Sequence, residues 1–415
     1  MVRAKPKSYD IAAGAVWEAY RRVKENRGAA GIDGQTFKDF EVNLEDNLYR
    51  IWNRMSSGSY FPPPVMQVEI PKGENQVRKL GIPTISDRIA QTVAKLYLEP
   101  IVEPKFHDDS YGYRPNRSAI DAVQKARVRC WRHLWTIDLD IKEFFDSIPH
   151  ELMMKAVRFH TQIPWLILYI ERWLKAPIGK REGQKVVRNQ GTPQGSAISP
   201  ILSNLFMHHA FDDWMRRTFP TIPFERYADD IVVHCRSKRQ AEMILDNIHR
   251  RLKECRLELH PKKTKIVYGL NGKKTRNGEH IQFDFLSFTF KPRSAVTRQG
   301  RHFLGFLPGV SNKAVKKMRD TMRSWKLTTH RHGYDLNQLA RLINPCVRGW
   351  LNYFGGFYRQ KLRRVLDDVN RLLTRWAKKK YKRLKRSRHK AQMWLRAISK
   401  REPKLFYMWT LGIRP

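Results

Sequence analysis

The spacing of apolar and polar residues changes repeatedly along the chain, and each change predicts a different type of element. Apolar residues three to four positions apart predict helices in residues 1–60, 87–106, 116–130, 150–176, 200–217 and 238–255, and in almost all of the chain from about residue 300. Alternating and apolar stretches predict strands in residues 65–70, 77–82, 133–141, 224–235 and 281–290, where each of the last two ranges holds a strand pair. Strands and helices do not alternate strictly, so the pattern favours an α+β fold.

Turn-forming residues separate these elements. Residues 26–34 contain three glycines and interrupt the first helical region. Residues 71–75 predict the turn of a β-hairpin with arms 65–70 and 77–82. Residues 191–200 combine Gly, Pro and Ser and predict a loop.

The amino-acid composition indicates which class of molecule the protein binds. The 415 residues include 80 Lys and Arg against 39 Asp and Glu, a formal net charge of +41 at pH 7. Self-repulsion of this size opposes compaction, which favours a polyanionic partner such as nucleic acid. Hydrophobic residues form 41% of the chain and aromatic ones 11%, which excludes disorder for most of it. Residues 301–415 carry 25 of the 41 excess positive charges, most densely between Arg375 and Lys390.

The sequence gives no sign of a membrane or secretory protein. The longest apolar run, Trp165 to Ile170, is far too short to span a bilayer, and no apolar region follows the basic N-terminus. The four cysteines lie far apart without a Cys-x-x-Cys pair, which argues against a structural zinc site and more strongly against a disulfide framework. We therefore expect a cytoplasmic protein that does not bind a membrane.

Two aspartates occupy the polar face of the strand predicted at 133–141. Alternation places Trp135, Ile137, Leu139 and Ile141 on one face and Thr136, Asp138 and Asp140 on the other. These acids are either solvated at a sheet edge or ligands of a divalent metal ion, and this segment alone leaves both interpretations open.

A second acidic pair lies between two apolar stretches, at the predicted hairpin tip Asp229-Asp230. Aspartate is common in turns for local reasons. Beside Asp140, however, the pair would form a three-carboxylate cluster that needs a divalent counter-charge, and oxygen ligands together with substrate phosphates favour Mg²⁺. Two such ions would suit an in-line displacement at phosphorus.

Tyr227-Ala-Asp-Asp230 matches the Tyr-x-Asp-Asp signature of reverse transcriptases, and the chain specifically resembles the group II intron-encoded reverse transcriptase/maturase family. The blocks that carry the resemblance occur in the family's order, and they are Arg78-Lys-Leu-Gly-Ile-Pro-Thr84, Asp87-Arg88, Ser110-Tyr-Gly-Tyr-Arg-Pro115, Asp140-Ile-Lys-Glu-Phe-Phe-Asp146, Gly191-Thr-Pro-Gln-Gly195 and Ser199-Pro200. The resemblance covers roughly residues 20–360.

The resemblance implies a right-hand polymerase fold: fingers and palm with an antiparallel sheet, then an all-α thumb/maturase (X) domain. The implied domains are an N-terminal extension at 1–64, fingers and palm at 65–295, the thumb/maturase domain at 296–375 and a basic helical tail at 376–415. Gly349-Trp-Leu-Asn-Tyr-Phe354 resembles the family's X block. Leu339, Leu342, Ile343, Val347 and Leu351 near it recur at helical spacing and favour a helix core.

The family's catalytic metal triad matches Asp140, Asp229 and Asp230. Asp138 is a rival for Asp140, but the family has an aromatic residue five positions after the metal ligand, where Asp140 gives Phe145 and Asp138 gives Glu143. Phe145 then resembles the steric gate that excludes ribonucleotides. Its alternative role is in the core beside Phe144.

The remaining implied site residues surround the incoming nucleotide and the primer. Those matching the nucleotide site are Lys72, Arg78, Gln194, Gly195, Ala228 and Lys263. Lys72, Arg78 and Lys263 are alternatively solvated surface charges, and Pro193-Gln-Gly195 a simple turn. Phe285-Leu-Ser-Phe288 resembles the primer grip, with Ser287 where the family usually has Gly, which matters because Gly tolerates positive φ.

The resemblance implies an RNA-directed DNA polymerase with two Mg²⁺ ions, for which Mn²⁺ is a possible substitute, and with an RNA template, a DNA or RNA primer, dNTPs and structured group II intron RNA as partners. With no Cys after Cys346 and no clustered His there, we expect no endonuclease domain. Two alternatives stay open: a free-standing domesticated reverse transcriptase in DNA repair or phage defence, and an RNA-binding splicing factor with incidental polymerase activity. The oligomeric state is left open too.

Overall fold

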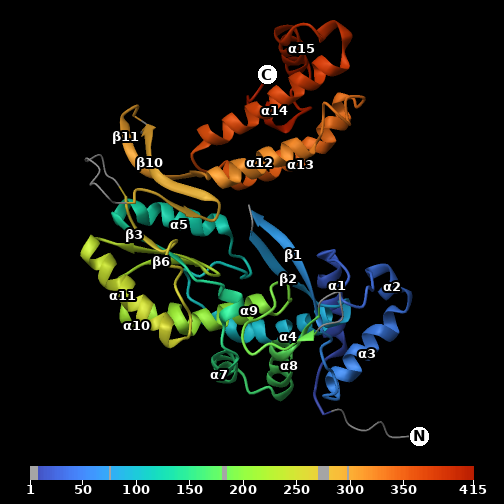
Figure 1. The fold of residues 1–415 in the computed structure, drawn as a ribbon, viewed down its shortest axis with the longest axis vertical. Coiled ribbons are helices and arrows are strands. Elements are labelled where there is room, and N and C mark those ends of the chain that lie inside the picture. The colour runs from blue at the N-terminus through green and yellow to red at the C-terminus, as the bar shows by residue number, and fades with distance from the viewer. Residues whose placement is uncertain (1–7, 74–75, 180–184, 270–279, 297–298) are drawn as a thin grey trace. The chain divides into compact units, whose positions relative to one another are not determined.

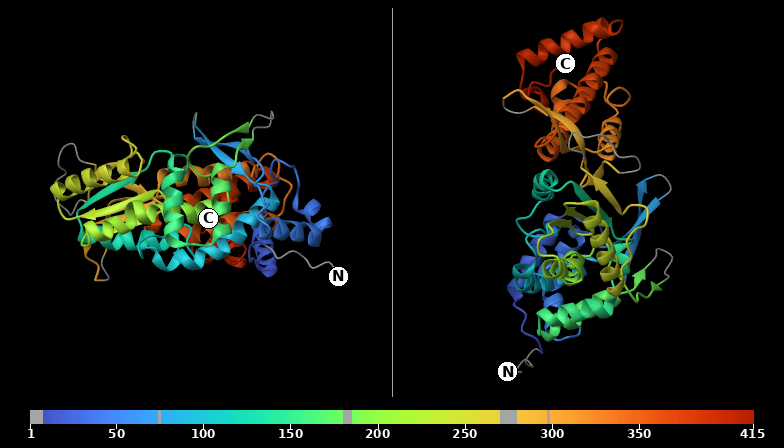
Figure 2. Two further views of the ribbon diagram at one scale, coloured as in Figure 1. Left: turned by 90° about the horizontal axis from the view of Figure 1, so that it is seen from below. Right: turned by 90° about the vertical axis from the view of Figure 1, so that its left-hand side faces the viewer.

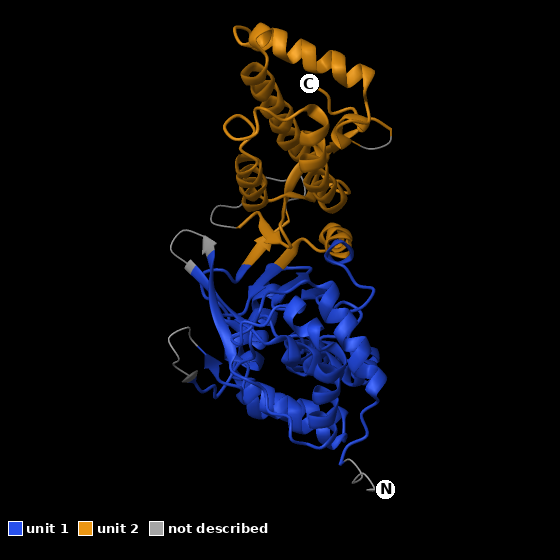
Figure 3. Ribbon diagram, turned by 90° about the vertical axis from the view of Figure 1, so that its right-hand side faces the viewer, with its two compact units in different colours: residues 1–122, 137–265 blue, residues 123–136, 266–415 orange. Residues whose placement is uncertain are grey.

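The computed structural model describes residues 8–73, 76–179, 185–269, 280–296 and 299–415 (Figure 1). The chain divides into two compact units (Figure 3). Unit 1 comprises residues 1–122 and 137–265, and unit 2 comprises residues 123–136 and 266–415. The expected mixed α+β fold is confirmed, since the described residues form three sheets and many helices. The four domain boundaries drawn from the sequence stay a prediction.

Helices make up much of unit 1. They are α1 (Ala13–Glu25), α2 (Phe37–Val42), α3 (Leu44–Ser56), α4 (Ile85–Val102), η1 (Glu103–Lys105), α6 (Phe144–Ser147), α7 (His150–His160), α8 (Pro164–Lys175), α9 (Ser199–Met207), η2 (His208–Asp212), α10 (Asp213–Thr218) and α11 (Lys238–Glu254). Side-chain caps fix several starts: Thr36 and Asp39 form a capping box on α2, and Ser237 accepts from Gln240 N at α11. The apolar stripe of α4 is almost fully buried, and α1, α3, α8 and α9 pack against this helix.

The strands that carry the predicted site chemistry lie in two sheets. One has the order β2-β1-β4-β5, with β1 (Val65–Gly73), β2 (Gln76–Ile82), β4 (Ile178–Gly179) and β5 (Lys185–Val186). The other has the order β6-β7-β3-β8, with β3 (Trp135–Asp140), β6 (Phe224–Tyr227), β7 (Asp230–Cys235) and β8 (Lys265–Tyr268). The β1–β2 hairpin projects as a two-stranded ribbon from the helices of unit 1 (Figure 2).

Helices dominate unit 2 after its sheet. That sheet has the order β11-β10-β9, with β9 (Phe283–Phe285), β10 (Phe288–Val296) and β11 (His302–Val310). The helices are α5 (Ala119–Arg132), which begins in unit 1, and then α12 (Asn312–Ser324), α13 (Leu336–Phe354), α14 (Arg359–Lys380), η3 (Lys382–Leu384), α15 (Arg388–Arg401) and α16 (Tyr407–Thr410). The buried stripe of α14 packs against α12, α13 and α15. In the described part of the chain, no helix is long and apolar enough to cross a bilayer.

Most elements expected from the sequence are present, and three differ. Residues 71–73 belong to β1 rather than to a turn, because a register shift between Pro71 and Gly73 lets the pairing continue past the proline. Residues 302–310 form β11 rather than helix, because they pair with β10 along its whole length. The helix expected at 200–217 contains a π-helical turn, η2. On α13, the expected core positions Leu339, Ile343 and Val347 are buried, whereas Leu342 and Leu351 are half-buried.

The β9–β10 turn takes the conformation that glycine favours, without a glycine. Phe285 pairs with Phe288, so Leu286 and Ser287 are the two turn residues, and both have positive φ, 50° and 70°. Packing holds this turn in place: Phe288 is buried against Tyr353, whose hydroxyl donates to the Leu286 carbonyl at 2.9 Å. A tight turn therefore forms here with Ser287 at a position whose positive φ glycine would tolerate better.

Replacing Ser287 by Gly should stabilise the protein by about 1 kcal/mol, because the exposed serine side chain only adds strain at φ 70°. The free energy of unfolding from urea titration measures the effect. Ser287→Ala is the matched control, since alanine keeps the left-handed strain and should leave stability within about 0.5 kcal/mol of wild type. Equal gains from the two substitutions would contradict the strain argument.

Candidate active site

Two acidic residues stand at the tip of the β6–β7 hairpin. Tyr227 pairs with Asp230, so Ala228 and Asp229 form the two-residue turn. Ala228 has a φ of 59°, a left-handed conformation that costs a non-glycine residue energy and that clusters at functional sites. Ala228 is buried, while Asp229 and Asp230 are half-buried. The turn thus presents two partly accessible carboxylates on a strained backbone.

A buried arginine immediately before the turn holds it in place. The guanidinium of Arg226 is fully buried and donates two hydrogen bonds to the carboxylate of Asp212, at 2.7 and 2.5 Å. It also donates to Asn204 Oδ1 at 3.0 Å, to the Ala228 carbonyl at 3.1 Å and to Ser110 Oγ at 2.7 Å. These five hydrogen bonds match the donor capacity of a guanidinium, which is how a buried charge is tolerated. Nothing in the sequence alone singles out Arg226 or Asp212.

The segment that begins at Ser110 packs directly on the turn. A side chain at Gly112 would place its Cβ 2.6 Å from the Ala228 nitrogen, so only glycine permits this approach. Asn204 Nδ2 donates to the Gly112 carbonyl at 2.6 Å, and the backbone of Arg226 hydrogen bonds with Tyr111 N and Asp109 O. This gives the sequence block 110–115 a physical role: it supports the acidic hairpin from one side.

Asp140 ends the strand next to the hairpin. The sheet order makes β7, which begins at Asp230, a hydrogen-bonded neighbour of β3, which ends at Asp140. One apolar face of β3 is buried as predicted, and Asp138 and Asp140 are half-buried. Asp140 is the more accessible of the two, with its side chain 31% exposed against 13% for Asp138. This accessibility favours Asp140 for a ligand role, and its assignment over Asp138 stays a prediction.

Lysine side chains neutralise both β3 aspartates. Lys263 Nζ lies 2.5 Å from Asp140 Oδ2, and Lys265 Nζ lies 3.5 Å from Asp138 Oδ2. Across the described residues, Asp140, Asp229 and Asp230 do not bring three carboxylate oxygens within 4.8 Å of one another. Lys263 thus lies beside the predicted metal ligand and acts as its counter-charge. Carboxylate oxygens at the ends of two neighbouring strands are a donor set that suits a hard divalent cation.

Tyr113 lies beside the hairpin turn. Its ring centroid lies 6.2 Å from that of Tyr227. Burial raises the pKa of Tyr113, the negative charge of Asp229 adds to the increase, and the positive charge of Arg78 opposes it. Arg78 and Asp229 are therefore both close enough to influence the same phenol. Arg78 is exposed on β2, on the arm facing β1, where Lys72 lies; the Lys72 side chain is outside the described residues.

The loop at 191–195 bridges the ribbon and the segment that carries Phe145. Thr192 N donates to the Phe145 carbonyl at 2.7 Å, and Gln194 Nε2 donates to Asp146 Oδ2 at 3.2 Å. At Gly195, φ is 112° and an added Cβ would lie 2.4 Å from the Gly81 carbonyl oxygen, so the loop contacts β2 closely. Phe145 is half-buried and its ring lies 5.3 Å from that of buried Phe144. Phe145, Gln194 and Gly195 are thus brought into one region of unit 1.

A buried polar network fixes the same loop from behind. Asp87 accepts hydrogen bonds from Tyr60 and Trp173 at Oδ1 and from Gln91 at Oδ2, each at 2.8 Å. Gln91 Oε1 in turn accepts from Ser196 Oγ at 2.5 Å and from Ala197 N at 2.8 Å. Asp87 is fully buried, and this desolvation raises its pKa to about 6. The block at Asp87 thereby acquires a structural explanation that its sequence alone did not provide.

The predicted primer grip, residues 285–288, belongs to the β9–β10 turn of unit 2 described above.

Arg188 was not singled out by the sequence. It is a positive neighbour of Asp146, and burial lowers the pKa of its guanidinium. Arg188 belongs to none of the sequence motifs, which explains why only the structure brings it beside Asp146.

Comparison with known families matches both parts of the chain. Residues 70–307 match the family described as reverse transcriptase (RNA-dependent DNA polymerase). Residues 315–394 match the family described as group II intron, maturase-specific domain. The first match includes every residue of the geometry around the hairpin turn, and the second covers most of the helices of unit 2.

Individual relatives agree with these matches. The chain is 30% identical to Protein YkfC of Escherichia coli (strain K12), over 61% of this chain and 77% of the relative. It is 33% identical to Group II intron-encoded protein LtrA of Lactococcus lactis subsp. cremoris, over 46% of this chain and 32% of the relative. It is 30% identical to the Putative COX1/OXI3 intron 1 protein of Saccharomyces cerevisiae, over 48% of this chain and 23% of the relative. The matches thus span a third or less of the last two relatives.

Asp87 should make the stability of the protein depend on pH. The pKa of Asp87 is about 6 in the folded protein, against an ordinary pKa of 3.8. The protonated side chain therefore contributes to the free energy of unfolding. This contribution is fully present below pH 3.8 and is lost as the pH rises through 6. The loss amounts to about 3 kcal/mol. Asp87→Asn has no such proton, so the wild-type advantage over Asp87→Asn should shrink by that amount between pH 4 and pH 7, as measured by urea unfolding at each pH.

The exposed Asp246 on α11 supplies the matched control, because Asp246→Asn should follow the wild-type pH profile within about 0.5 kcal/mol. Parallel pH profiles for wild type and Asp87→Asn would contradict the raised pKa.

Proposed function

The chain belongs to the reverse transcriptase family and carries the maturase-specific domain of group II introns, and from this premise we propose how its residues copy RNA into DNA. The proposed reaction is template-directed nucleotidyl transfer. The primer 3′-oxygen forms a bond to the α-phosphorus of a dNTP, the bond from that phosphorus to the bridging oxygen breaks, pyrophosphate leaves, and the 3′-hydroxyl proton passes to solvent. The single observation that carries the proposal is the acidic turn Ala228–Asp230 beside Asp140, supported by the buried Arg226.

Asp140, Asp229 and Asp230 are the residues we propose to hold two Mg²⁺ ions, with Mn²⁺ as a substitute. The family generally uses divalent ions, and three partly accessible carboxylates at the ends of adjacent strands fit such ions. When bound, the ions supply Lewis-acid stabilisation of the attacking and leaving oxygens. Lys263, 2.5 Å from Asp140 Oδ2 and 55% exposed, is free to leave Asp140 for the phosphates of a nucleotide.

The remaining residues position the nucleotide. Arg78 on β2 and Asp229 both influence the phenol of Tyr113 electrostatically, which supports a role for this guanidinium in binding triphosphate oxygens, and we assign Lys72 to the same role. Gln194 and Gly195 lie on the loop that packs on β2, where backbone amides can approach the nascent base pair. Ala228 has a small side chain, which suits a close approach of the primer terminus.

Phe145 is proposed as the gate against the ribose 2′-hydroxyl. Its carbonyl is fixed by Thr192 N, and its ring is half-buried rather than enclosed in the core, which leaves one side available to a sugar. The nearby Phe144 is fully buried and fills the core role. We therefore assign the core role to Phe144 and the gate role to Phe145.

The maturase-specific region supports binding of intron RNA. Residues 301–415 carry 30 Lys and Arg against 5 Asp and Glu, and their helices bury apolar stripes that leave most basic residues exposed. Phosphate contacts of this type position an RNA without reading its sequence. We propose that this region holds structured intron RNA and assists splicing and mobility, with the primer–template duplex on the β9–β10 turn.

Replacing Asp229 and Asp230 together by Ala should reduce Mg²⁺-dependent cDNA synthesis at least about 1,000-fold, since the metal sites contribute several kcal/mol to the transition state. Primer extension on an RNA template measures this, and filter binding of the same RNA should stay within about twofold of wild type. The matched control replaces the exposed acids Glu242 and Asp246 of α11 by Ala, with no effect on either measurement. Wild-type extension by the first variant would refute the site.

The same variant separates the two activities. Splicing of a precursor RNA by the Asp229/Asp230 variant at the wild-type rate would place the maturase activity in RNA binding alone. Loss of splicing together with polymerisation would favour a single coupled activity.

Phe145→Val should lower the preference for dNTP over rNTP at least about tenfold, because the smaller side chain no longer contacts the 2′ position. The ratio of kcat/KM for the two nucleotides on one template measures the preference. Phe145→Tyr keeps the ring and is the matched control, with the preference expected to stay close to wild type. An unchanged ratio for Phe145→Val would remove Phe145 from the gate role.

A further inference from the structure

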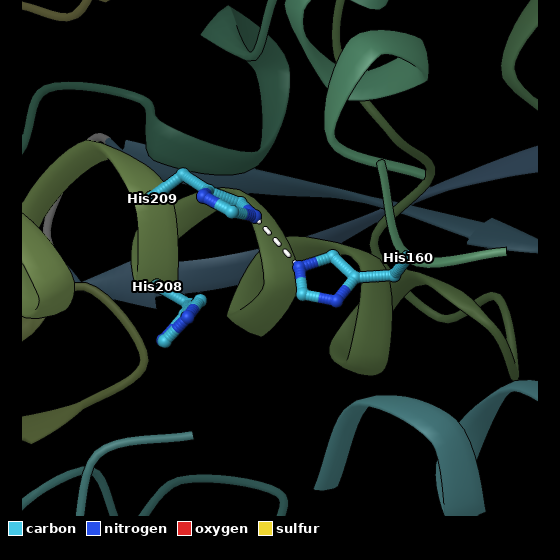
Figure 4. A group of neighbouring side chains, drawn as sticks. All are labelled: His160, His208 and His209. Carbon is cyan, nitrogen blue, oxygen red and sulfur yellow. Dashed lines mark hydrogen bonds between the residues drawn. The ribbon is translucent and has the colours of Figure 1, made fainter. Parts of the chain in front are cut away.

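Three histidines from two helices meet in unit 1 (Figure 4). His160 is the last residue of α7, and His208 and His209 are the first two residues of the π-helical turn η2. One ring nitrogen from each lies within 4.8 Å of the others, and all three residues are half-buried. They are separated by almost 50 positions in sequence and come together because α7 packs against α9, which leads into η2.

The nitrogen geometry is close to that of a metal centre. His160 Nε2 and His209 Nε2 are 2.8 Å apart (Figure 4), so one of them must present a lone pair to the other. Two imidazole nitrogens on one tetrahedral Zn²⁺ lie about 3.3 Å apart, given Zn–N bonds of about 2.0–2.1 Å. Opening this pair by about half an ångström, a shift within reach of side-chain rotation, would admit the ion.

His208 carries an unmet hydrogen-bonding group. Its Nδ1 is one of four buried side-chain nitrogen or oxygen atoms in the described ranges without a hydrogen-bond partner. Such a group costs free energy unless a ligand or ion satisfies it. The ring centroids of His208 and His209 lie 5.0 Å apart, those of His160 and His209 also 5.0 Å, and those of His160 and His208 6.2 Å, so the three imidazoles form one cluster.

The backbone that presents two successive histidines is unusual. Adjacent residues of an α-helix do not face each other, whereas His208 and His209 lie in a π-helical turn, a form that recurs at functional sites. Arg251 on α11 satisfies two carbonyls of this turn, donating to His209 O at 3.0 Å and to Ala210 O at 3.2 Å. Arg251 therefore holds the backbone of the turn that carries both histidines.

Burial keeps these histidines in the form that binds metal. Desolvation lowers the pKa of all three, that of His209 to about 4, so the imidazoles are neutral near pH 7. Charges of both signs influence the group. Asp212 and Asp213 favour a cation at His208, and Asp213 favours one at His209. Lys105 opposes a cation at His160, Arg226 one at His208 and Arg217 one at His209. Phe159 covers one side, with its ring edge-on to His160 and His209.

We propose that His160, His208 and His209 bind one divalent transition-metal ion, Zn²⁺ in the first place, through three imidazole nitrogens. Three protein ligands leave a fourth position for water or another small ligand. Nitrogen donors separate this site chemically from the aspartates of the hairpin, because imidazole suits Zn²⁺ while carboxylate oxygens suit Mg²⁺.

Zinc binding to the full chain tests the proposal. The protein is stripped of metal with a chelator and titrated with Zn²⁺ against a chromogenic competitor, with millimolar Mg²⁺ present to occupy the carboxylates. We expect one equivalent of Zn²⁺ bound, with affinity reduced at least tenfold in His160→Gln and in His208→Gln. His249→Gln, at an exposed histidine of α11, is the matched control and should bind as wild type does. Unaltered affinity in the first two variants, or no binding by wild type, would overturn the site.

Two further measurements guard against a folding artefact. Added Zn²⁺ should raise the Tm of wild type by at least about 3 °C and leave that of His160→Gln unchanged, because only a ligand of the folded state stabilises it. Co²⁺ in place of Zn²⁺ should give wild type the visible absorption bands of a nitrogen-ligated ion of low coordination number. A wild-type protein without the Tm shift and without these bands does not contain the site, whatever the variants do.

Discussion

The fully buried ion pair between Arg226 and Asp212 is the constraint on which the proposed active site depends. Removing two charges from water costs several kcal/mol per ion, and the attraction between them offsets this only when every donor is satisfied. Here all five hydrogen bonds of the guanidinium are made, one of them to the Ala228 carbonyl inside the strained turn. The pair therefore holds the backbone of the acidic turn in place through the Ala228 carbonyl, two residues after Arg226.

Close backbone approaches extend this constraint to the rest of the site. Gly112 brings the segment after Ser110 against the hairpin turn, and Gly195 brings the 191–195 loop against β2. Behind that loop, Asp87 and Gln91 form a dry hydrogen-bonded connection from α4 to Ser196. These contacts leave little freedom to the groups that must meet a nucleotide, and preorganisation of this type lets fixed groups stabilise charge without rearranging.

The sequence predicts two kinds of feature: elements that show a regular spacing of apolar residues, and blocks that follow a known order of motifs. Alternation in residues 135–141 predicts the buried face of β3, and the acidic pair between apolar stretches predicts the β6–β7 hairpin. It could not predict that β1 continues through Pro71 or that 302–310 is a strand, because both depend on pairing with a distant partner strand. Arg226 also escapes prediction, since nothing in its neighbourhood shows that Asp212 lies opposite.

The histidine group shows the same limit most clearly. Cysteine spacing argued against zinc, yet His160, His208 and His209 converge through the packing of two helices. The five residues of η2 carry His208 and His209 at one end and Asp212 at the other. The proposed ion would bind side chains at the first end of this segment, and the Arg226 guanidinium binds the Asp212 side chain at the second. The π-helical turn is thus where the proposed metal site and the support of the acidic hairpin meet.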